Sequence, residues 1–260
     1  MCNLLIKFGA FNDRYGQEFD KIATGHYATN YETKDGVFLA TAKDKVKDQT
    51  YFLSQITYPQ LHKTIFPIGN LPKSDVRKIA SEMSLPSATR KDSQGICFLG
   101  KINYGEFIKN QIGILPGEIR ELESNKLLGE HQGFWFHTIG QRRGLKLGGG
   151  PWFVVKKDTI NNIIYASKGY DPISRYSDEI ILNKVHFLNP NHDYSELNQI
   201  KFKIRHQPEF MEGFITIGDT TSKIVSKEKI SGIAPGQFTV IYSNDEKTCI
   251  GSAMISEDNN

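Results

Sequence analysis

A glycine-rich, basic segment at residues 133–150 divides this chain of 260 residues into parts with different sequence patterns. Glycine accepts positive φ and lets the main chain approach a ligand, so the segment predicts a shaped loop. Ahead of it, apolar residues recur at helical spacing, whereas from about residue 173 they fall into short strands. We therefore predict an α/β part at 1–106, a loop-rich part at 107–172 and an antiparallel β-barrel at 173–260.

Composition excludes several classes of protein. The hydrophobic fraction is 38% and the charged fraction 23%, as in ordinary globular proteins. No apolar run reaches the roughly 18 residues that a membrane span needs. The N-terminus has no basic region ahead of its short apolar stretch, so we expect no secretory signal. Three cysteines are too few for a disulfide scaffold and favour a reducing, cytoplasmic compartment.

Three helices are predicted ahead of the glycine-rich segment. The first places Leu4, Phe8, Phe11 and Tyr15 on one face. The second covers 74–84, with Ser74 as N-cap and a buried stripe of Val76, Ile79, Ala80 and Met83. The third covers 104–110.

Short apolar runs separated by turn residues predict the strands, and the run at 200–205 alternates with period two. A short strand running into Gly25 fits the carboxyl edge of an open α/β sheet, where ligands usually bind. The other predicted strands are 37–42, 180–182, 185–188, 200–205, 213–217, 237–242 and 249–255.

Each cysteine has a structural and a functional interpretation. Cys2 is either a frayed terminal thiol or a reactive one. Cys97 is either packed as a small hydrophobic residue or presented beside Arg90 and Lys91, where cations would favour its thiolate. Cys249 lies in a predicted strand and is expected to be structural.

A second candidate feature is positive charge. Between residues 131 and 157 there are five basic residues and no acidic one, interleaved with Trp135, Phe136, Trp152 and Phe153. Cations bind phosphates and aromatic rings stack on bases, so this pattern indicates RNA; alternatively, the aromatic rings belong to the core. His26 either faces a pocket or is an internally bonded histidine. No Cys or His spacing predicts a metal site.

The motifs resemble one family. The matching segments are Met1-Cys2-Asn3 with 6–9, Ala23-Thr24-Gly25-His26-Tyr27-Ala28, 47–53, 91–98, 131–133 with 138–145, and Ala234-Pro235-Gly236-Gln237. In this order they resemble the tRNA-specific 2-thiouridylases of the MnmA/TrmU type. The resemblance implies the remnant of an open α/β PP-loop domain (adenine nucleotide hydrolase-like), a small central tRNA-binding domain and a C-terminal antiparallel β-barrel.

One departure concerns ATP. The family begins with a phosphate cradle of the type Ser-Gly-Gly-Val-Asp-Ser, which this sequence does not contain. We therefore expect a truncated family member, with little or no thiolation by this chain alone and partly retained tRNA affinity. The alternative function is a non-catalytic tRNA-binding fragment, and a thiol-redox protein using Cys2 and Cys97 is a third.

The resemblance implies ATP-dependent sulfur transfer to C2 of the wobble uridine in the tRNA anticodon. Cys97 would carry the persulfide, loaded by a sulfur-relay protein or cysteine desulfurase, and Cys2 would be the nucleophile that releases the sulfur. ATP, with Mg²⁺, would bind at Gly25. No iron–sulfur cluster is expected, and the chain would be a monomer. The tRNA anticodon arm would contact His26, Lys47, Asp48, Gln49, Arg142, Arg143, Arg205, His206 and Gln237.

Overall fold

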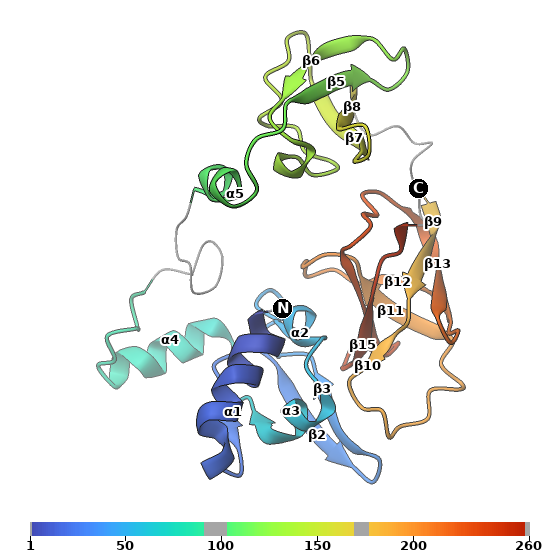
Figure 1. The fold of residues 1–260 in the computed structure, drawn as a ribbon. Helices are drawn as coiled ribbons and strands as arrows, with labels where there is room; N and C mark the ends of the chain where they lie inside the picture. The colour runs from blue at the N-terminus through green and yellow to red at the C-terminus, as the bar shows by residue number, and fades with distance from the viewer. Residues whose placement is uncertain (1, 91–102, 169–176, 258–260) are drawn as a thin grey trace. The chain divides into compact units, whose positions relative to one another are not determined.

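The computed structural model describes residues 2–90, 103–168 and 177–257 and divides the chain into two compact units (Figure 1). The first unit joins Met1–Asp92 to Asp178–Lys229 and Pro235–Asn260, and the second comprises Ser93–Ser177 and Ile230–Ala234. Two segments far apart in the sequence therefore build the first unit. No helix in the described ranges combines the length and apolar character needed to cross a bilayer.

The first unit begins with helical turns and short strands. Its elements are η1 (Asn3–Ala10), α1 (Phe11–Tyr15), η2 (Gly16–Glu18), β1 (Ile22–Ala23), β2 (Thr29–Thr33), β3 (Gly36–Ala40), α2 (Thr50–Leu53), α3 (Tyr58–Lys63), β4 (Thr64–Ile65) and α4 (Lys73–Glu82). After the second unit, the first resumes with β9 (Ser177–Asn183), β10 (His186–Phe187), β11 (Gln199–Lys203), β12 (Met211–Thr216), β13 (Thr221–Ile230), β14 (Phe238–Tyr242) and β15 (Thr248–Met254).

The predicted first helix exists, but its buried face was predicted wrongly. Phe8 is buried, whereas Phe11 and Tyr15 are 50% and 51% exposed. The cause is local, because η1 is a π-helix whose wider turn breaks the 3.6-residue spacing on which the stripe was based.

Helix α4 departs from its prediction in two ways. Its N-cap is Pro72 rather than Ser74, whose hydroxyl lies beside Asp75 instead. Its predicted stripe is not buried, since Ile79 and Met83 are 43% and 65% exposed. The spacing of apolar residues identified the helix. It could not show whether another helix or strand packs against the apolar face.

The main sheet of the first unit continues across both of its segments. The strand order is β2-β3-β15-β14-β11-β12-β13-β9, and β10 also pairs with β15. The junction is the antiparallel pairing of Leu39 with Cys249 and of Ala40 with Thr248. An isolated antiparallel bridge joins Leu182 to Ile255, close to the end of β15.

One hydrophobic core supports both segments of this unit. Its buried members include Phe8, Leu39, Leu53, Val240 and Tyr242. Cys249 lies fully inside it, as the structural interpretation predicted, and burial raises the pKa of its thiol far above the ordinary value. A separate two-stranded parallel sheet pairs β1 with β4.

The second unit has a four-stranded sheet and one helix. Its elements are α5 (Tyr104–Ile112), β5 (Gly117–Glu121), β6 (Leu127–His131), η3 (Phe134–Phe136), β7 (Trp152–Asp158) and β8 (Ile163–Lys168), with the strand order β6-β5-β8-β7. The side chain of Asn103 caps α5 by accepting from the Glu106 main-chain N–H. Ile119, Leu145, Trp152 and Ile164 form much of the buried core.

Candidate nucleic-acid interface

Cys2 lies at the start of η1, where two amide side chains fix the helix. Asn3 Nδ2 donates to the Phe52 carbonyl at 2.8 Å, and Gln60 Nε2 donates to the Leu4 carbonyl at 3.2 Å. The Cys2 thiol is free and half-buried. The start of η1 is therefore anchored, and the interpretation of Cys2 as a frayed terminal thiol is wrong. The predicted partner, Cys97, lies outside the described residues.

His26 is an internally bonded histidine at the carboxyl end of β1. Lys7 Nζ lies 3.1 Å from His26 Nε2, and Thr24 Oγ1 lies 2.7 Å from Nδ1. An ammonium only donates, so Nε2 accepts and Nδ1 carries the proton. The side chain is 7% exposed. Burial, reinforced by the Lys7 charge, lowers the pKa of His26 to about 4 and keeps the ring neutral.

Gly25 is the exposed residue of the same turn. A Cβ placed on Gly25 would meet no atom within 4 Å, so open space surrounds the main chain there. The turn follows the parallel strand β1, as predicted for a ligand-binding edge. The main chain at Gly25 can therefore be approached closely by a ligand.

Asp48 uses its side chain inside the protein. Its carboxylate accepts from the Ala42 main-chain N–H at 2.7 Å and from the Thr50 hydroxyl at 2.5 Å. The Thr50 hydroxyl also lies 3.0 Å from the Tyr242 hydroxyl, which joins the loop to β14. Burial raises the pKa of Asp48, although these hydrogen bonds and the Lys203 charge oppose the shift.

Gln49 also makes internal bonds. Its Oε1 accepts from the Tyr27 main-chain N–H at 2.9 Å, and its own N–H donates to the Tyr27 carbonyl at 2.8 Å. The loop at 47–49 is thereby tied to the residue after His26. Lys47 is half-buried, and its N–H is held by Asp44.

The structure brings a third predicted segment to this loop. His206 Nε2 donates to the Asp48 carbonyl at 3.1 Å, and its ring lies 4.6 Å from the ring of Phe52. Arg205 and His206 are both exposed. This histidine and Asp48 stand 158 positions apart in the sequence, so only the fold makes them neighbours.

Tyr51 connects the segment that carries Gln237 to the same cluster. Its hydroxyl donates to the carbonyls of Phe238 and Ile204, at 3.0 and 3.3 Å. Burial raises the pKa of Tyr51, and Arg205 opposes the shift. Gln237 precedes Phe238 in the sequence and Arg205 follows Ile204, and both Gln237 and Arg205 are exposed. We call Asp48, Tyr51, Phe52, Arg205 and His206 the His206 cluster.

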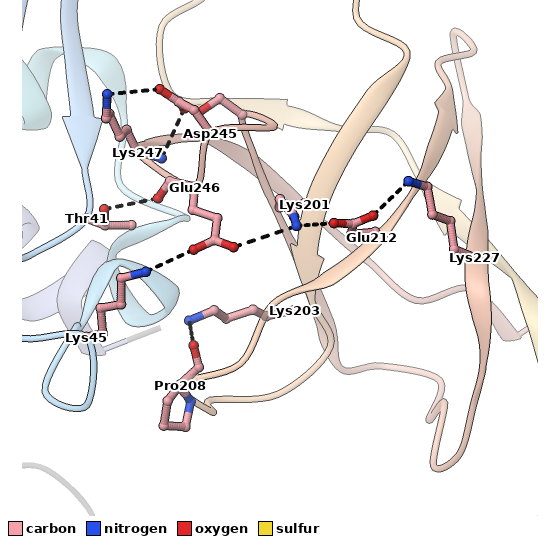
Figure 2. Close-up of polar contacts among 11 residues, drawn as sticks. Thr41, Lys45, Lys201, Lys203, Pro208, Glu212, Lys227, Asp245, Glu246 and Lys247 are labelled. Carbon is pink, nitrogen blue, oxygen red and sulfur yellow. Dashed lines mark hydrogen bonds and ion pairs between the residues drawn. The ribbon is translucent and has the colours of Figure 1, made fainter.

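A chain of ion pairs crosses strands of the first unit (Figure 2). Glu246 lies 3.1 Å from Lys45 and 3.7 Å from Lys201, and Lys201 also pairs with Glu212. Hydrogen bonds from Lys201 and Lys227 lower the pKa of Glu212 to about 2. These pairs link the loop after β3 to β11 and β12.

In the second unit, the glycine-rich segment forms the predicted shaped loop. Gly140 and Gly144 have positive φ, at 83° and 90°. Gln141 holds the turn between them: its Oε1 accepts from the Thr138 N–H at 2.9 Å, and its Nε2 donates to the Arg143 carbonyl at 2.8 Å. Arg142 and Arg143 are exposed on this held turn.

Not every aromatic residue near the arginines is available to bases. Trp152 is buried in the core of the second unit, and its indole N–H donates to the Gly148 carbonyl at 2.9 Å. The alternative that the aromatics belong to the core is therefore correct for Trp152. Trp135 and Phe136 are partly exposed.

Sequence reasoning missed several residues that build the site. Lys7, Tyr51 and Phe52 lie inside matching motifs but were given no role, and Lys203 was not singled out. The described residues contain no cluster of His, Cys, Asp and Glu suited to a metal ion.

Three family models match consecutive parts of the chain. They are described as the tRNA methyl transferase HUP domain at residues 1–101, the tRNA methyl transferase PRC-barrel domain at 105–168 and the aminomethyltransferase beta-barrel domain at 177–255. The α/β part, the central part and the sheet-rich C-terminal part were all predicted in this order.

Relatives match nearly the whole chain. A protein of Parabacteroides distasonis named tRNA-specific 2-thiouridylase MnmA is 56% identical over 99% of this chain and 73% of its own length. The chain belongs to the tRNA-specific 2-thiouridylase MnmA family. Proteins of Porphyromonas gingivalis and Bacteroides thetaiotaomicron, named MnmA and MnmA 1, are 53% and 54% identical over 99% and 98% of the chain and 73% of their own lengths. The family resemblance drawn from the motifs is thereby confirmed.

Proposed function

We propose that this chain acts as a tRNA-uridine 2-sulfurtransferase, converting the wobble uridine of an anticodon to 2-thiouridine. The observation that carries the proposal is the His206 cluster, because it joins the motif at 47–53 to Arg205 and His206, on a unit whose anchored N-terminus presents the free thiol of Cys2. Family membership over 99% of the chain supports the choice of reaction.

The sulfur transfer uses two cysteines. ATP, when bound with Mg²⁺, would transfer its AMP group to the C2 oxygen of uridine and release pyrophosphate, which makes that oxygen part of a good leaving group. The outer sulfur of a Cys97 persulfide attacks C2, and AMP departs with the electrons of the C–O bond. The Cys2 thiolate then attacks the inner sulfur of Cys97 and breaks the persulfide bond. The outer sulfur stays on C2, a Cys2–Cys97 disulfide forms, and an external dithiol reduces it.

The exposed turn at Gly25 fits a nucleotide that lies against the main chain. We propose it as the part of the ATP site that this chain supplies. A sulfur-relay protein or cysteine desulfurase would load Cys97, and the chain would act as a monomer in three domains, 1–106, 107–172 and 173–260.

The proposed tRNA-binding residues fall into two groups by burial. Lys47, Arg142, Arg143, Arg205, His206 and Gln237 are half-buried or exposed and would contact phosphates and bases. The side chains of His26, Asp48 and Gln49 form hydrogen bonds within the protein. These three residues would therefore act indirectly, by holding the loops that carry the exposed tRNA-binding residues.

The test is direct detection of the product. The chain is incubated with ATP, a persulfide donor and unmodified tRNA, and the nucleosides are analysed by mass spectrometry. We expect 2-thiouridine from the wild type and none from Cys97→Ser or Cys2→Ser, with Cys249→Ser as a matched control that keeps the product. The Parabacteroides relative serves as positive control for the assay. A Cys2→Ser variant as active as the wild type would contradict the assigned role, and tRNA binding without product would leave a binding protein only.

A further inference from the structure

Lys203 is a buried lysine at the end of β11. Its side chain belongs to a residue that is only 3% exposed. Lysine is almost never fully buried unless it is paired, because its ammonium loses hydration. Burial lowers the pKa of Lys203, and nearby charges led by Asp48 oppose the shift. A specific set of partners must therefore compensate for the burial of this ammonium.

The partners of Lys203 lie in the loop that follows it. Its Nζ donates to the carbonyls of Gln207 and Pro208, at 2.9 and 3.3 Å, and the contact with Pro208 is drawn in Figure 2. The same Nζ lies 3.9 Å from the ring centroid of Phe210. Cation–π attraction strengthens when the cation is desolvated, as it is here. The ammonium thus fastens the far half of the loop at 204–210 from inside.

The near half of this loop carries the proposed tRNA contacts. Arg205 and His206 are exposed there, and His206 is bound to the Asp48 carbonyl. Tyr51 fastens the start of the loop through the Ile204 carbonyl. The loop is therefore held at both ends. Tyr51 holds it before Arg205, and the Lys203 ammonium holds it after His206, at Gln207 and Pro208.

We propose that Lys203 is a positioning residue for tRNA binding: by holding the carbonyls of Gln207 and Pro208, it presents Arg205 and His206 to the tRNA. This inference rests on the proposed function. Lys203 does not itself reach the RNA, so its effect on affinity must pass through the loop.

The experiment is a double-mutant cycle on tRNA affinity, measured by fluorescence anisotropy. Lys203→Met removes the ammonium and keeps an apolar chain of similar length. We expect about a tenfold loss of affinity in the wild-type background and less than about a twofold further loss in an Arg205→Ala, His206→Ala background. Hydrogen exchange of the 204–210 amides should accelerate in Lys203→Met.

Lys201→Met is the matched control. It removes an ammonium two residues earlier in the same strand, where the partners are Glu212 and Glu246 instead of the loop. We expect unchanged exchange at 204–210 and less than about a twofold change in affinity. If Lys203→Met does not fold, Phe210→Leu, which removes the ring beneath the ammonium, replaces it in the same cycle.

Three outcomes overturn the inference. They are a folded Lys203→Met with wild-type affinity, equal losses in both backgrounds, and unchanged exchange at 204–210. Failure of the proposed function looks different: the wild type would then show either no tRNA binding at all, or tRNA binding without 2-thiouridine and with the double-mutant cycle intact.

Discussion

His206 donates from Nε2 to the main-chain carbonyl of Asp48 over 3.1 Å. Because a carbonyl only accepts, the proton must be on Nε2, and Nδ1 of a neutral ring is left as an acceptor. The bond joins two motifs that the sequence separates widely and that were both predicted to bind tRNA. It also makes the position of His206 depend on how the loop at Asp48 is held.

The first prediction concerns the Asp48 carboxylate. Asp48→Asn replaces one acceptor oxygen with a donor, so the amide cannot accept from both Ala42 and Thr50. We expect the free energy of unfolding to fall by about 1–3 kcal/mol, because a buried donor loses its partner. Urea denaturation measures it. Asp219→Asn, in an exposed turn, is the control, and equal stability of the two variants would contradict the prediction.

The second prediction is a pH dependence from His26. Its pKa is about 4 in the folded protein against an ordinary value of 6.5, so between these values only the unfolded chain binds the proton. Stability from this group is therefore complete above about pH 6.5 and is lost as the pH falls toward 4. From pH 7.5 to pH 5 we expect a loss of about 2 kcal/mol.

His26→Gln isolates this contribution from the other titrating groups. Glutamine keeps an acceptor for Lys7 but does not titrate, so the variant should lose about 2 kcal/mol less than the wild type over the same range. Urea midpoints at both pH values, with the slope checked for constancy, provide the comparison. If stability depended on pH identically in the wild type and in His26→Gln, the pKa of His26 would not differ between the folded and unfolded chain, which contradicts the prediction.

The C-terminal strands were predictable because short apolar runs recur there with turn residues between them. The predicted strands in the C-terminal part are confirmed as β9, β10, β11, β12, β14 and β15, within a few residues at their ends. Strand β13 was missed, although it spans Thr221–Ile230. Its inward face includes Ser222 and Ser226, so polar residues occupy positions where the pattern requires apolar ones.

The site was predictable only as a set of motifs. Sequence patterns placed Asp48 and Gln49 in a functional segment, but they could not show that both side chains bond internally. Gln49 bonds to Tyr27, 22 positions away, and the Thr50 hydroxyl that bonds to Asp48 also contacts Tyr242, 192 positions away. The sequence also could not predict the burial of Lys203, because it does not show that the loop carrying Gln207 folds back onto the ammonium.

The third prediction compares two glycines. A Cβ on Gly69 would lie 1.7 Å from the Ala28 carbonyl oxygen, whereas a Cβ on Gly25 would meet nothing within 4 Å. Gly69→Ala must displace the main chain beside the His26 turn, and we expect a loss of about 1–3 kcal/mol. Gly25→Ala should change stability by less than about 0.5 kcal/mol.

Gly25→Ala should instead weaken ATP binding, because the added methyl group occupies the space that we assign to the nucleotide. Thermal denaturation measures stability, and calorimetric titration measures ATP affinity. A stable Gly25→Ala variant with wild-type affinity would remove Gly25 from the proposed site.

The fourth prediction concerns the salt dependence of tRNA binding. Arg142 and Arg143 stand exposed on a turn that Gln141 holds, so they can contact phosphates without refolding the loop. Each phosphate contact contributes about 0.7 to the slope of log affinity against log salt for single-stranded nucleic acid. Replacing both arginines with alanine should therefore weaken binding and reduce the slope by up to about 1.4. Lys126→Ala, exposed in the turn between β5 and β6, should leave the slope unchanged, and an unchanged slope in the double variant would exclude the arginines from the interface.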